Sequence, residues 1–172
     1  MAEKELTSEQ VLSYLAETPR RIAERTEGLE PEQLRTASEP DAWSANDVLA
    51  HLRCCADVWG SYMARILAED RPAIRAVSPR RWIERTDYPD LEFGPSFEAF
   101  GAQREELLVV LEALPPAGWS RAAVVTGVGR PIDRTVLNYA ERLARHERSH
   151  FRQIESIVAA LHGGRLATTH QK

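Results

Sequence analysis

The sequence predicts an all-α fold, a four-helix bundle with a long connection between its second and third helices. Four segments carry apolar residues at helical spacing, and clusters of proline and glycine separate them. No segment shows the alternation of a convincing sheet. The 172 residues suffice for one domain. We expect this domain to span residues 1–164 and a polar C-terminal tail to occupy residues 165–172.

The first helix is expected to begin at Thr7, because Thr7 and Gln10 have the spacing of a capping box. Apolar residues then recur at helical spacing: Val11, Leu12, Leu15 and Ile22. Pro19 interrupts them, and it either kinks this helix or starts a second segment. The helical pattern ends near Gly28.

The second helix is expected to follow Ser44, a good N-cap residue with Asp47 at the third helical position. A wide apolar stripe continues from there to about Ala68. Residues 69–95 then contain several prolines, so we expect an irregular connection with one short helical turn. A connection of this length suggests a crossover, and a plain up-down-up-down order therefore does not follow.

The third helix is expected to start at Ser96, its cap, and to stop at Pro115 and Pro116. Residues 122–132 are rich in β-branched side chains and contain two glycines. This composition predicts either a small hairpin or an extended loop.

The last helix is expected to begin at Asp133 or Thr135 and to end at Gly163 and Gly164. Its apolar stripe consists of Val136, Leu137, Ala140, Leu143, Ala144, Phe151, Ile154, Ile157, Val158 and Leu161. A stripe of this length makes it the longest amphipathic segment of the chain.

Composition argues against several functions. The 43% hydrophobic and 28% charged residues are those of an ordinary soluble protein, and the net charge of -4 argues against a nucleic-acid binder. No apolar run approaches the ~20 residues that span a membrane, and the acidic N-terminus is unlike a signal peptide. The adjacent Cys54 and Cys55 form no secreted disulfide framework. We therefore expect a cytoplasmic protein.

Three of the five histidines fall on apolar helix faces. His146 and His150 are one helical turn apart, which lets two imidazoles reach one metal ion. His51 lies three residues after Val48 and four before Cys55, on the apolar face of the second helix. A buried imidazole must find hydrogen-bond partners or coordinate something. Spacing alone leaves both alternatives open.

Two segments carry a family resemblance. The segment from Trp43 to Leu52 resembles the W-S…L-x-H-L signature of the DinB-like superfamily of bacterial four-helix-bundle proteins. The segment from His146 to Ile154 resembles the second signature of that family, H-x-x-x-H-x-x-Q-I. The order of the signatures and the gap between them also fit, so the resemblance covers nearly the whole chain.

The resemblance implies a divalent metal ion, zinc or nickel, held by His51, His146 and His150. It also implies a homodimer. Known members of the family include thiol-dependent transferases and isomerases, such as mycothiol-dependent maleylpyruvate isomerase and bacillithiol S-transferases. The resemblance therefore suggests a small-molecule substrate and a low-molecular-weight thiol as co-substrate, with no nucleic acid and no membrane involved.

Three imidazoles leave at least one coordination position open, which is typical of catalytic metal sites. A water bound there could lose a proton near neutral pH, or a thiolate could bind directly. Our leading hypothesis is activation of a low-molecular-weight thiol for transfer to a small electrophile. The alternatives are a hydrolase that uses the same residues and a non-catalytic metal- or ligand-binding module.

Several neighbours of the histidines have weaker claims to a role. Gln153 could orient a ligand or form an ordinary hydrogen bond across the bundle. Asp47 is best explained as a helix cap, and Cys54 could approach the metal. Glu147 is expected to face away from His146 as a surface carboxylate paired with an arginine.

The remaining candidates are expected to be structural or peripheral. Arg148 and Arg152 could bind an anionic substrate if they faced the mouth of the bundle, although solvated charges are the default. Trp43 and Trp119 are expected to pack at junctions between loops and helices. His162 and His170 lie beyond the apolar stripe or in the tail, and we assign them no function.

Overall fold

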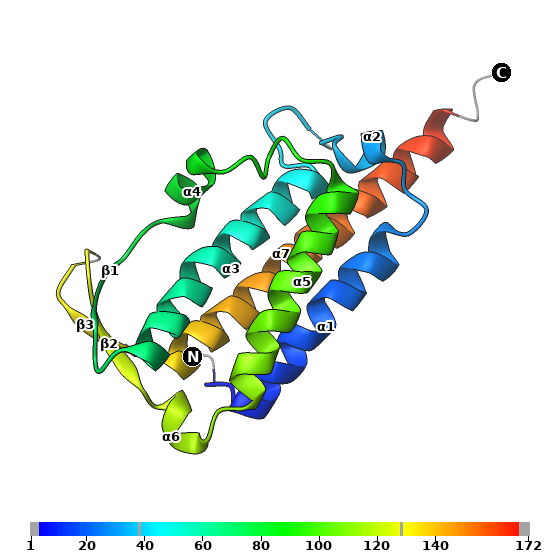
Figure 1. Cartoon of the computed structure of the whole chain (residues 1–172). Helices are drawn as coiled ribbons and strands as arrows, with labels where there is room; N and C mark the ends of the chain where they lie inside the picture. Colours follow the sequence, from blue (N-terminus) through cyan, green and yellow to red (C-terminus); the bar gives the residue numbers. More distant parts are fainter. Residues whose placement is uncertain (1–3, 38, 128, 169–172) are drawn as a thin grey trace.

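Four long helices form a bundle in the computed structural model (Figure 1). The structure describes residues 4–37, 39–127 and 129–168, with only the backbone for residues 163–168. The long helices are α1 (Ser8–Thr26), α3 (Ala45–Ala68), α5 (Phe93–Glu112) and α7 (Val136–Thr168). The predicted four-helix bundle is thus confirmed.

The long helices do not follow an up-down-up-down order. Both α1 and α3 pack against α5 and α7, so α1 lies diagonally opposite α3, and α5 lies diagonally opposite α7. Figure 1 shows that α1 and α7 run in one direction and that α3 and α5 run in the other. Because α3 and α5 are parallel, the chain between them must return along the bundle, which is the crossover that the long connection suggested.

Capping residues set the beginnings of α1 and α3 as predicted. The Thr7 hydroxyl accepts a hydrogen bond from the Gln10 amide at 3.3 Å, and the Gln10 side chain accepts one from the Thr7 amide at 3.0 Å. Ser44 and Asp47 form the equivalent reciprocal pair. Pro19 lies inside a continuous α1, so it starts no second segment.

The predicted start of the third long helix is wrong by one turn. Helix α5 begins at Phe93, and Glu92 is its N-cap. Proline is tolerated in a first turn because the amides there have no partner within the helix, so Pro95 does not delay the start. Ser96 is instead buried, and its hydroxyl accepts a hydrogen bond from Arg53 at 3.1 Å.

The connections carry short elements and a small sheet. These are α2 (Pro31–Leu34), β1 (Ala73–Arg75), α4 (Pro79–Trp82), the 3-10 helix η1 (Ile83–Arg85), α6 (Pro116–Trp119), β2 (Ala122–Thr126) and β3 (Ile132–Thr135). Strands β2 and β3 form a hairpin, one of the two predicted alternatives, and its turn contains Gly127 and Gly129 at φ 87° and 99°. Strand β1 pairs in parallel with β2, which the sequence did not predict.

Helix α7 starts as predicted but ends later. It begins at Val136, directly after Thr135, whose hydroxyl accepts a hydrogen bond from the Asn138 amide at 3.1 Å. It continues to Thr168, past the glycines expected to end it. A glycine that ends a helix adopts positive φ, whereas Gly163 and Gly164 lie within the helical backbone. None of the helices in the described ranges is long and apolar enough to cross a membrane.

The interior consists of two apolar clusters placed one after the other along the bundle. One contains Cys55 and Trp59 of α3 together with Leu143 and Ala144 of α7. The other contains Leu49, Leu52, Phe151 and Ile154 among its residues. In α7, His146 and His150 come between these two clusters, and in α3 His51 lies near their boundary, among Leu49, Leu52 and Cys55, so polar side chains interrupt the core.

Candidate metal centre

The three predicted ligands meet between α3 and α7. Nε2 of His146 lies 3.3 Å from Nε2 of His51 and 3.2 Å from Nε2 of His150. His51 is buried, and the two histidines of α7 are half-buried. The structure thus brings together the three residues that helical spacing selected, with the same ring nitrogen of each imidazole turned toward the others.

The hydrogen bonding leaves these nitrogens suited to a metal ion. Nδ1 of His150 donates to Oε1 of Gln153 at 2.8 Å, so Nε2 of His150 has a free lone pair. Nε2 of His146 carries at most one proton, and that proton cannot be donated to Nε2 of both His51 and His150. Two zinc–nitrogen bonds at a tetrahedral angle would hold the nitrogens about 3.4 Å apart, close to the observed separations. The residues therefore fit a divalent ion.

All three imidazoles are held in the neutral form that binds metals. Burial, reinforced by the neighbouring His150, lowers the pKa of His51 to about 4. Burial and the two other histidines lower the pKa of His146 to about 3. Burial also lowers the pKa of His150, although the bond to Gln153 opposes this shift. The lone pairs are thus available at neutral pH without loss of a proton.

A sulfur atom that the sequence analysis missed lies in the same cluster. Sγ of Cys55 is 3.5 Å from Nε2 of His51 and 3.9 Å from Nε2 of His146. The ligand atoms of these three residues all lie within 4.8 Å of one another, as one metal ion requires. Burial raises the pKa of the Cys55 thiol. The signal was present, because Cys55 follows His51 by four residues, the spacing that also joins His146 to His150.

The prediction that Cys54 could approach the metal is wrong. Cys54 precedes Cys55 by one residue, which corresponds to about 100° of rotation around the helix. Its side chain therefore points away from the histidines that Cys55 contacts. Its sulfur lies 4.0 Å from the hydroxyl of Thr86, beside the crossover connection. Burial raises the pKa of Cys54 to about 11, so the thiol is protonated at neutral pH.

Two tryptophans enclose the histidines. Trp43 stacks on His150 with ring centroids 6.0 Å apart and meets His51 edge-on at 5.1 Å. Trp59 meets His146 edge-on at 5.0 Å. Trp43 does lie at a loop–helix junction as expected, but it packs directly on the imidazoles. Trp119 is buried in an apolar cluster of the core, which confirms its structural role.

Glu147 faces away from the histidines, as predicted, but it is not a surface residue. Its side chain is fully buried and forms an ion pair with the equally buried Arg104 of α5. Burial raises the pKa of Glu147, and the Arg104 guanidinium opposes that shift. The pair joins the two diagonally opposed helices α5 and α7 across the centre of the bundle.

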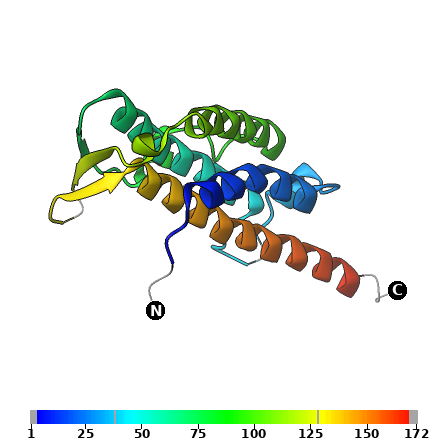
Figure 2. The same cartoon turned by 90° about the horizontal axis from the view of Figure 1, so that it is seen from below.

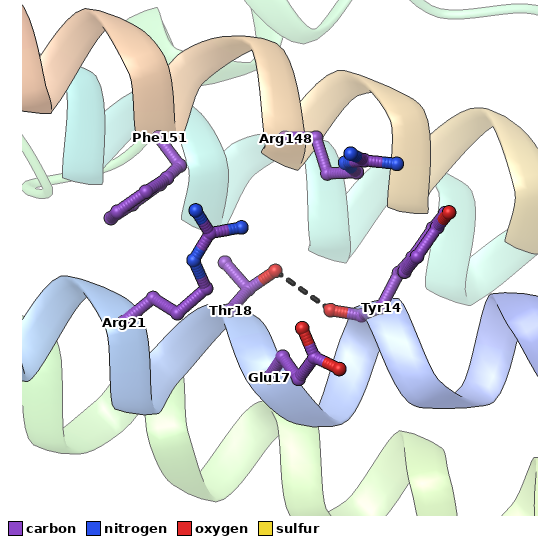
Figure 3. A pocket seen from close by; sticks show the side chains of 6 residues that line it. All are labelled: Tyr14, Glu17, Thr18, Arg21, Arg148 and Phe151. Atoms are coloured by element: carbon purple, nitrogen blue, oxygen red, sulfur yellow. Dashed lines mark hydrogen bonds between the residues drawn. The ribbon is translucent and has the colours of Figure 1, made fainter.

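The two arginines proposed for anion binding do not lie beside the histidines. Arg148 points toward α1, where its guanidinium lies 4.3 Å from the centre of the Tyr14 ring (Figure 3). It lines a cavity of about 40 Å³ between α1 and α7. Arg152 is exposed, as is His162. His170 lies outside the described residues.

The remaining neighbours have the roles of supporting residues. Gln153 fixes the orientation of His150 through the bond described above, which is one of its two predicted roles. Asp47 is the helix cap, since its carboxylate accepts hydrogen bonds from the amide and hydroxyl of Ser44 at 2.9 and 2.6 Å. Asp47 is thus engaged with Ser44, in agreement with its prediction as a cap.

Comparisons with known proteins agree with this architecture. The chain is 26% identical over 149 residues to a protein of Geobacillus thermodenitrificans (strain NG80-2) named "Putative metal-dependent hydrolase", covering 85% of this chain and 81% of that protein. The fold matches that of YfiT from Bacillus subtilis with a TM-score of 0.71 and 21% identity, covering 91% of this chain and 90% of the other. YfiT is described as "a probable metal-dependent hydrolase with an unusual four-helix bundle topology".

A profile of the DinB superfamily matches residues 14–154, the part of the chain that contains both signature segments and all of α3 and α5. The chain therefore belongs to the DinB superfamily.

Proposed function

We propose that this protein is a metal-dependent enzyme that holds a divalent ion, zinc or nickel, with His51, His146 and His150. The observation that carries the proposal is the convergence of three neutral imidazole nitrogens within 3.3 Å of their neighbours. An ion bound there would act as a Lewis acid on a nucleophile at its remaining position. The names of the Geobacillus and Bacillus relatives support this chemistry.

The protein's own residues prepare the site in three ways. Gln153 fixes the ring of His150 and its protonation. Trp43 and Trp59 pack on the imidazoles and restrict their rotation. Burial keeps the histidines neutral, so protons do not compete for the lone pairs above their lowered pKa values. These contacts preorganise the ligands before any substrate arrives.

We favour water as the nucleophile, and hence hydrolysis, because both named relatives are described as hydrolases. Transfer of a low-molecular-weight thiol, which the resemblance suggested first, would use the same three histidines. Parallel assays separate the two reactions, one with a panel of ester and amide substrates and one following conjugation of thiols to small electrophiles. Turnover that persists in full after the metal is removed would contradict both.

The metal site itself is tested by elemental analysis of the purified protein and of two variants. We expect one divalent ion per chain in the wild type and almost none in His51→Ala. His162→Ala is the matched control, because His162 is an exposed histidine of α7 and its loss should leave the metal content unchanged. Equal metal contents in the wild type and His51→Ala would remove the proposal.

Cys55 favours a second candidate function, a metal-binding module without turnover. If its sulfur bound the ion, four protein ligands would close a tetrahedral site, as in structural zinc sites. Cobalt-substituted protein distinguishes the two, because a cobalt–thiolate bond gives a charge-transfer absorption that Cys55→Ala would abolish. The absence of that absorption in the wild type would leave the position open and favour the enzyme.

We further propose that the protein forms a homodimer, as its family resemblance suggests. The support comes from one helix surface, because two neighbouring apolar residues of α5, Val109 and Val110, are 69% and 46% exposed. Replacing both valines with glutamate should convert a dimer into monomers, as measured by sedimentation. A wild type that sediments as a monomer at all concentrations would contradict this assembly.

A further inference from the structure

A large cleft lies beside the metal centre, at the end of the bundle that carries the sheet. It has a volume of about 1360 Å³ and is bounded by the end of α3, the segment of residues 76–85, the β2–β3 hairpin and the start of α7. Figure 2 shows the hairpin and the beginning of α7 together at this end, far from the C-terminus. Neither the proposed metal ligands nor the signature segments account for such a cleft.

The lining of the cleft is strongly basic, although the chain is acidic. Six arginines and two glutamates line it, whereas the whole chain has a net charge of -4. The six are Arg81, Arg85, Arg130, Arg134, Arg142 and Arg145. A concave surface of one charge sign concentrates ligands of the opposite sign. The distribution of charge in this protein therefore favours an anion in the cleft.

Most of these arginines have no anionic partner in the part of the chain that the structure describes. The Arg145 side chain bonds to Glu141, but among the described residues the side chains of the other five form no ion pair and no hydrogen bond. Elsewhere on the surface, Arg20, Arg65 and Arg71 each pair with a carboxylate. The cleft thus gathers guanidinium groups whose donors remain available, and such groups bind phosphate and carboxylate in pairs of hydrogen bonds.

Aromatic side chains form another part of the wall and connect it to the histidines. They are Trp59, Tyr62, Trp82 and Tyr139. The Tyr62 hydroxyl accepts a hydrogen bond from the Val77 amide at 2.6 Å, which fixes this part of the wall. Trp59 lines the cleft and also contacts His146, and the Arg142 guanidinium lies 4.8 Å from the centre of the Trp59 ring. A ligand in the cleft would therefore lie next to the metal centre.

We propose that the cleft binds a small organic anion, an aromatic or other apolar body that carries a phosphate or carboxylate group, as the substrate of the metal centre. The arginines hold the anionic group, and the aromatic wall holds the body of the molecule against Trp59. This substrate class rests on the proposed function, but anion binding itself needs only the cleft.

Binding is measured through the intrinsic fluorescence of Trp59 and Trp82, which line the cleft. The probes are phenyl phosphate, benzene-1,3-dicarboxylate and uncharged phenol. We expect at least one anion to bind about tenfold tighter than phenol, since a hydrogen bond to a charged group contributes that much or more. The better of the two anions identifies the group as phosphate or carboxylate.

Variants locate the binding. Arg134→Ala combined with Arg142→Ala should weaken anion binding about tenfold or more, because both side chains line the cleft. Arg152→Ala, an exposed arginine of the same helix α7, should bind as the wild type does. Equal affinity of the double variant and the wild type overturns the proposal. So does binding of a single-stranded oligonucleotide in strong preference to both small anions.

His51→Ala separates this proposal from the metal site. It should lose the metal and still bind the anion, because His51 does not line the cleft. If the wild type holds no metal but binds the anion at the arginines, the proposed function fails and the cleft remains an anion site. If metal is present and neither anion binds, the cleft proposal fails alone.

Discussion

Helix α7 carries two polar clusters on different faces, and the two clusters accommodate polar groups in the interior of the bundle in different ways. Toward α3, His146 and His150 meet His51, and all three are held neutral by burial. Toward α5, Glu147 meets Arg104, and the two opposite charges neutralise each other. The ion pair offsets its own two charges, although Nε and Nη1 of Arg104 and Oε2 of Glu147 have no hydrogen-bond partner among the described residues. Three converging nitrogen lone pairs instead leave a position for a cation. Buried polar groups therefore mark a candidate metal site where their lone pairs converge, and not wherever a polar atom lacks a partner.

The largest effect should come from breaking the ion pair. Glu147→Ala leaves the Arg104 charge buried without compensation, which should lower the free energy of unfolding by about 3–5 kcal/mol. Urea denaturation measures this loss. The metal content of the folded protein should stay unchanged, because Glu147 faces away from the histidines.

A double variant provides the control for this prediction. Arg104→Met combined with Glu147→Leu removes both charges together, and similar apolar replacements are neutral or stabilising. It should therefore be more stable than Glu147→Ala. A stability of Glu147→Ala within about 1 kcal/mol of the wild type would show that the pair is not buried as described.

Acid should act on the histidine cluster next. Without metal, His51 titrates near pH 4 in the folded state and near 6.5 when unfolded. Between these values the unfolded chain binds more protons, so stability is complete above about pH 6.5 and falls as the pH drops toward 4. Thermal unfolding of metal-free protein across this range measures the loss.

The matched variant for the acid effect is His51→Asn, whose side chain does not titrate. The difference in stability between wild type and variant should depend on pH only below about 6.5. A constant difference from pH 7 to pH 4 would show that His51 is not held neutral in the folded protein.

The smallest effect should come from Gln153. Gln153→Leu removes the acceptor that fixes Nδ1 of His150 and should weaken metal affinity about 10–100-fold. Competition with a chelator measures this affinity. Arg152→Leu, an exposed neighbour, is the control and should bind metal normally. Identical affinities for all three proteins would mean that Gln153 does not position the ligand.

The two clusters also differ in how far the sequence could predict them. The relative positions of His146 and His150, and the face of His51, follow from helical periodicity, which is local. Helical periodicity likewise predicted that Glu147 faces away from His146. It could not show that Arg104 lies opposite, because the pair joins diagonally opposed helices and the order of helices in a bundle is not a local property.

The same limit explains the other differences. The hairpin could be predicted as one of two alternatives from its β-branched residues and glycines, which are neighbours in sequence. Strand β1 is only three residues long, and its partner β2 comes after α5. The arginines of the cleft come from segments of the chain as distant as residues 81 and 145. Only the crossover brings these segments together.

The pairing of β1 with β2 bears on the local stability of the cleft wall. Ala73 meets Val124, so this contact closes a loop that contains the whole of α5. Closing a long loop is entropically unfavourable, and only three residue pairs join β1 to β2. The contact between His51 and His146 closes a longer loop, but the packed faces of α3 and α7 support it. By the same reasoning, we expect amide hydrogens of β1 to exchange with solvent through local openings while the long helices stay folded.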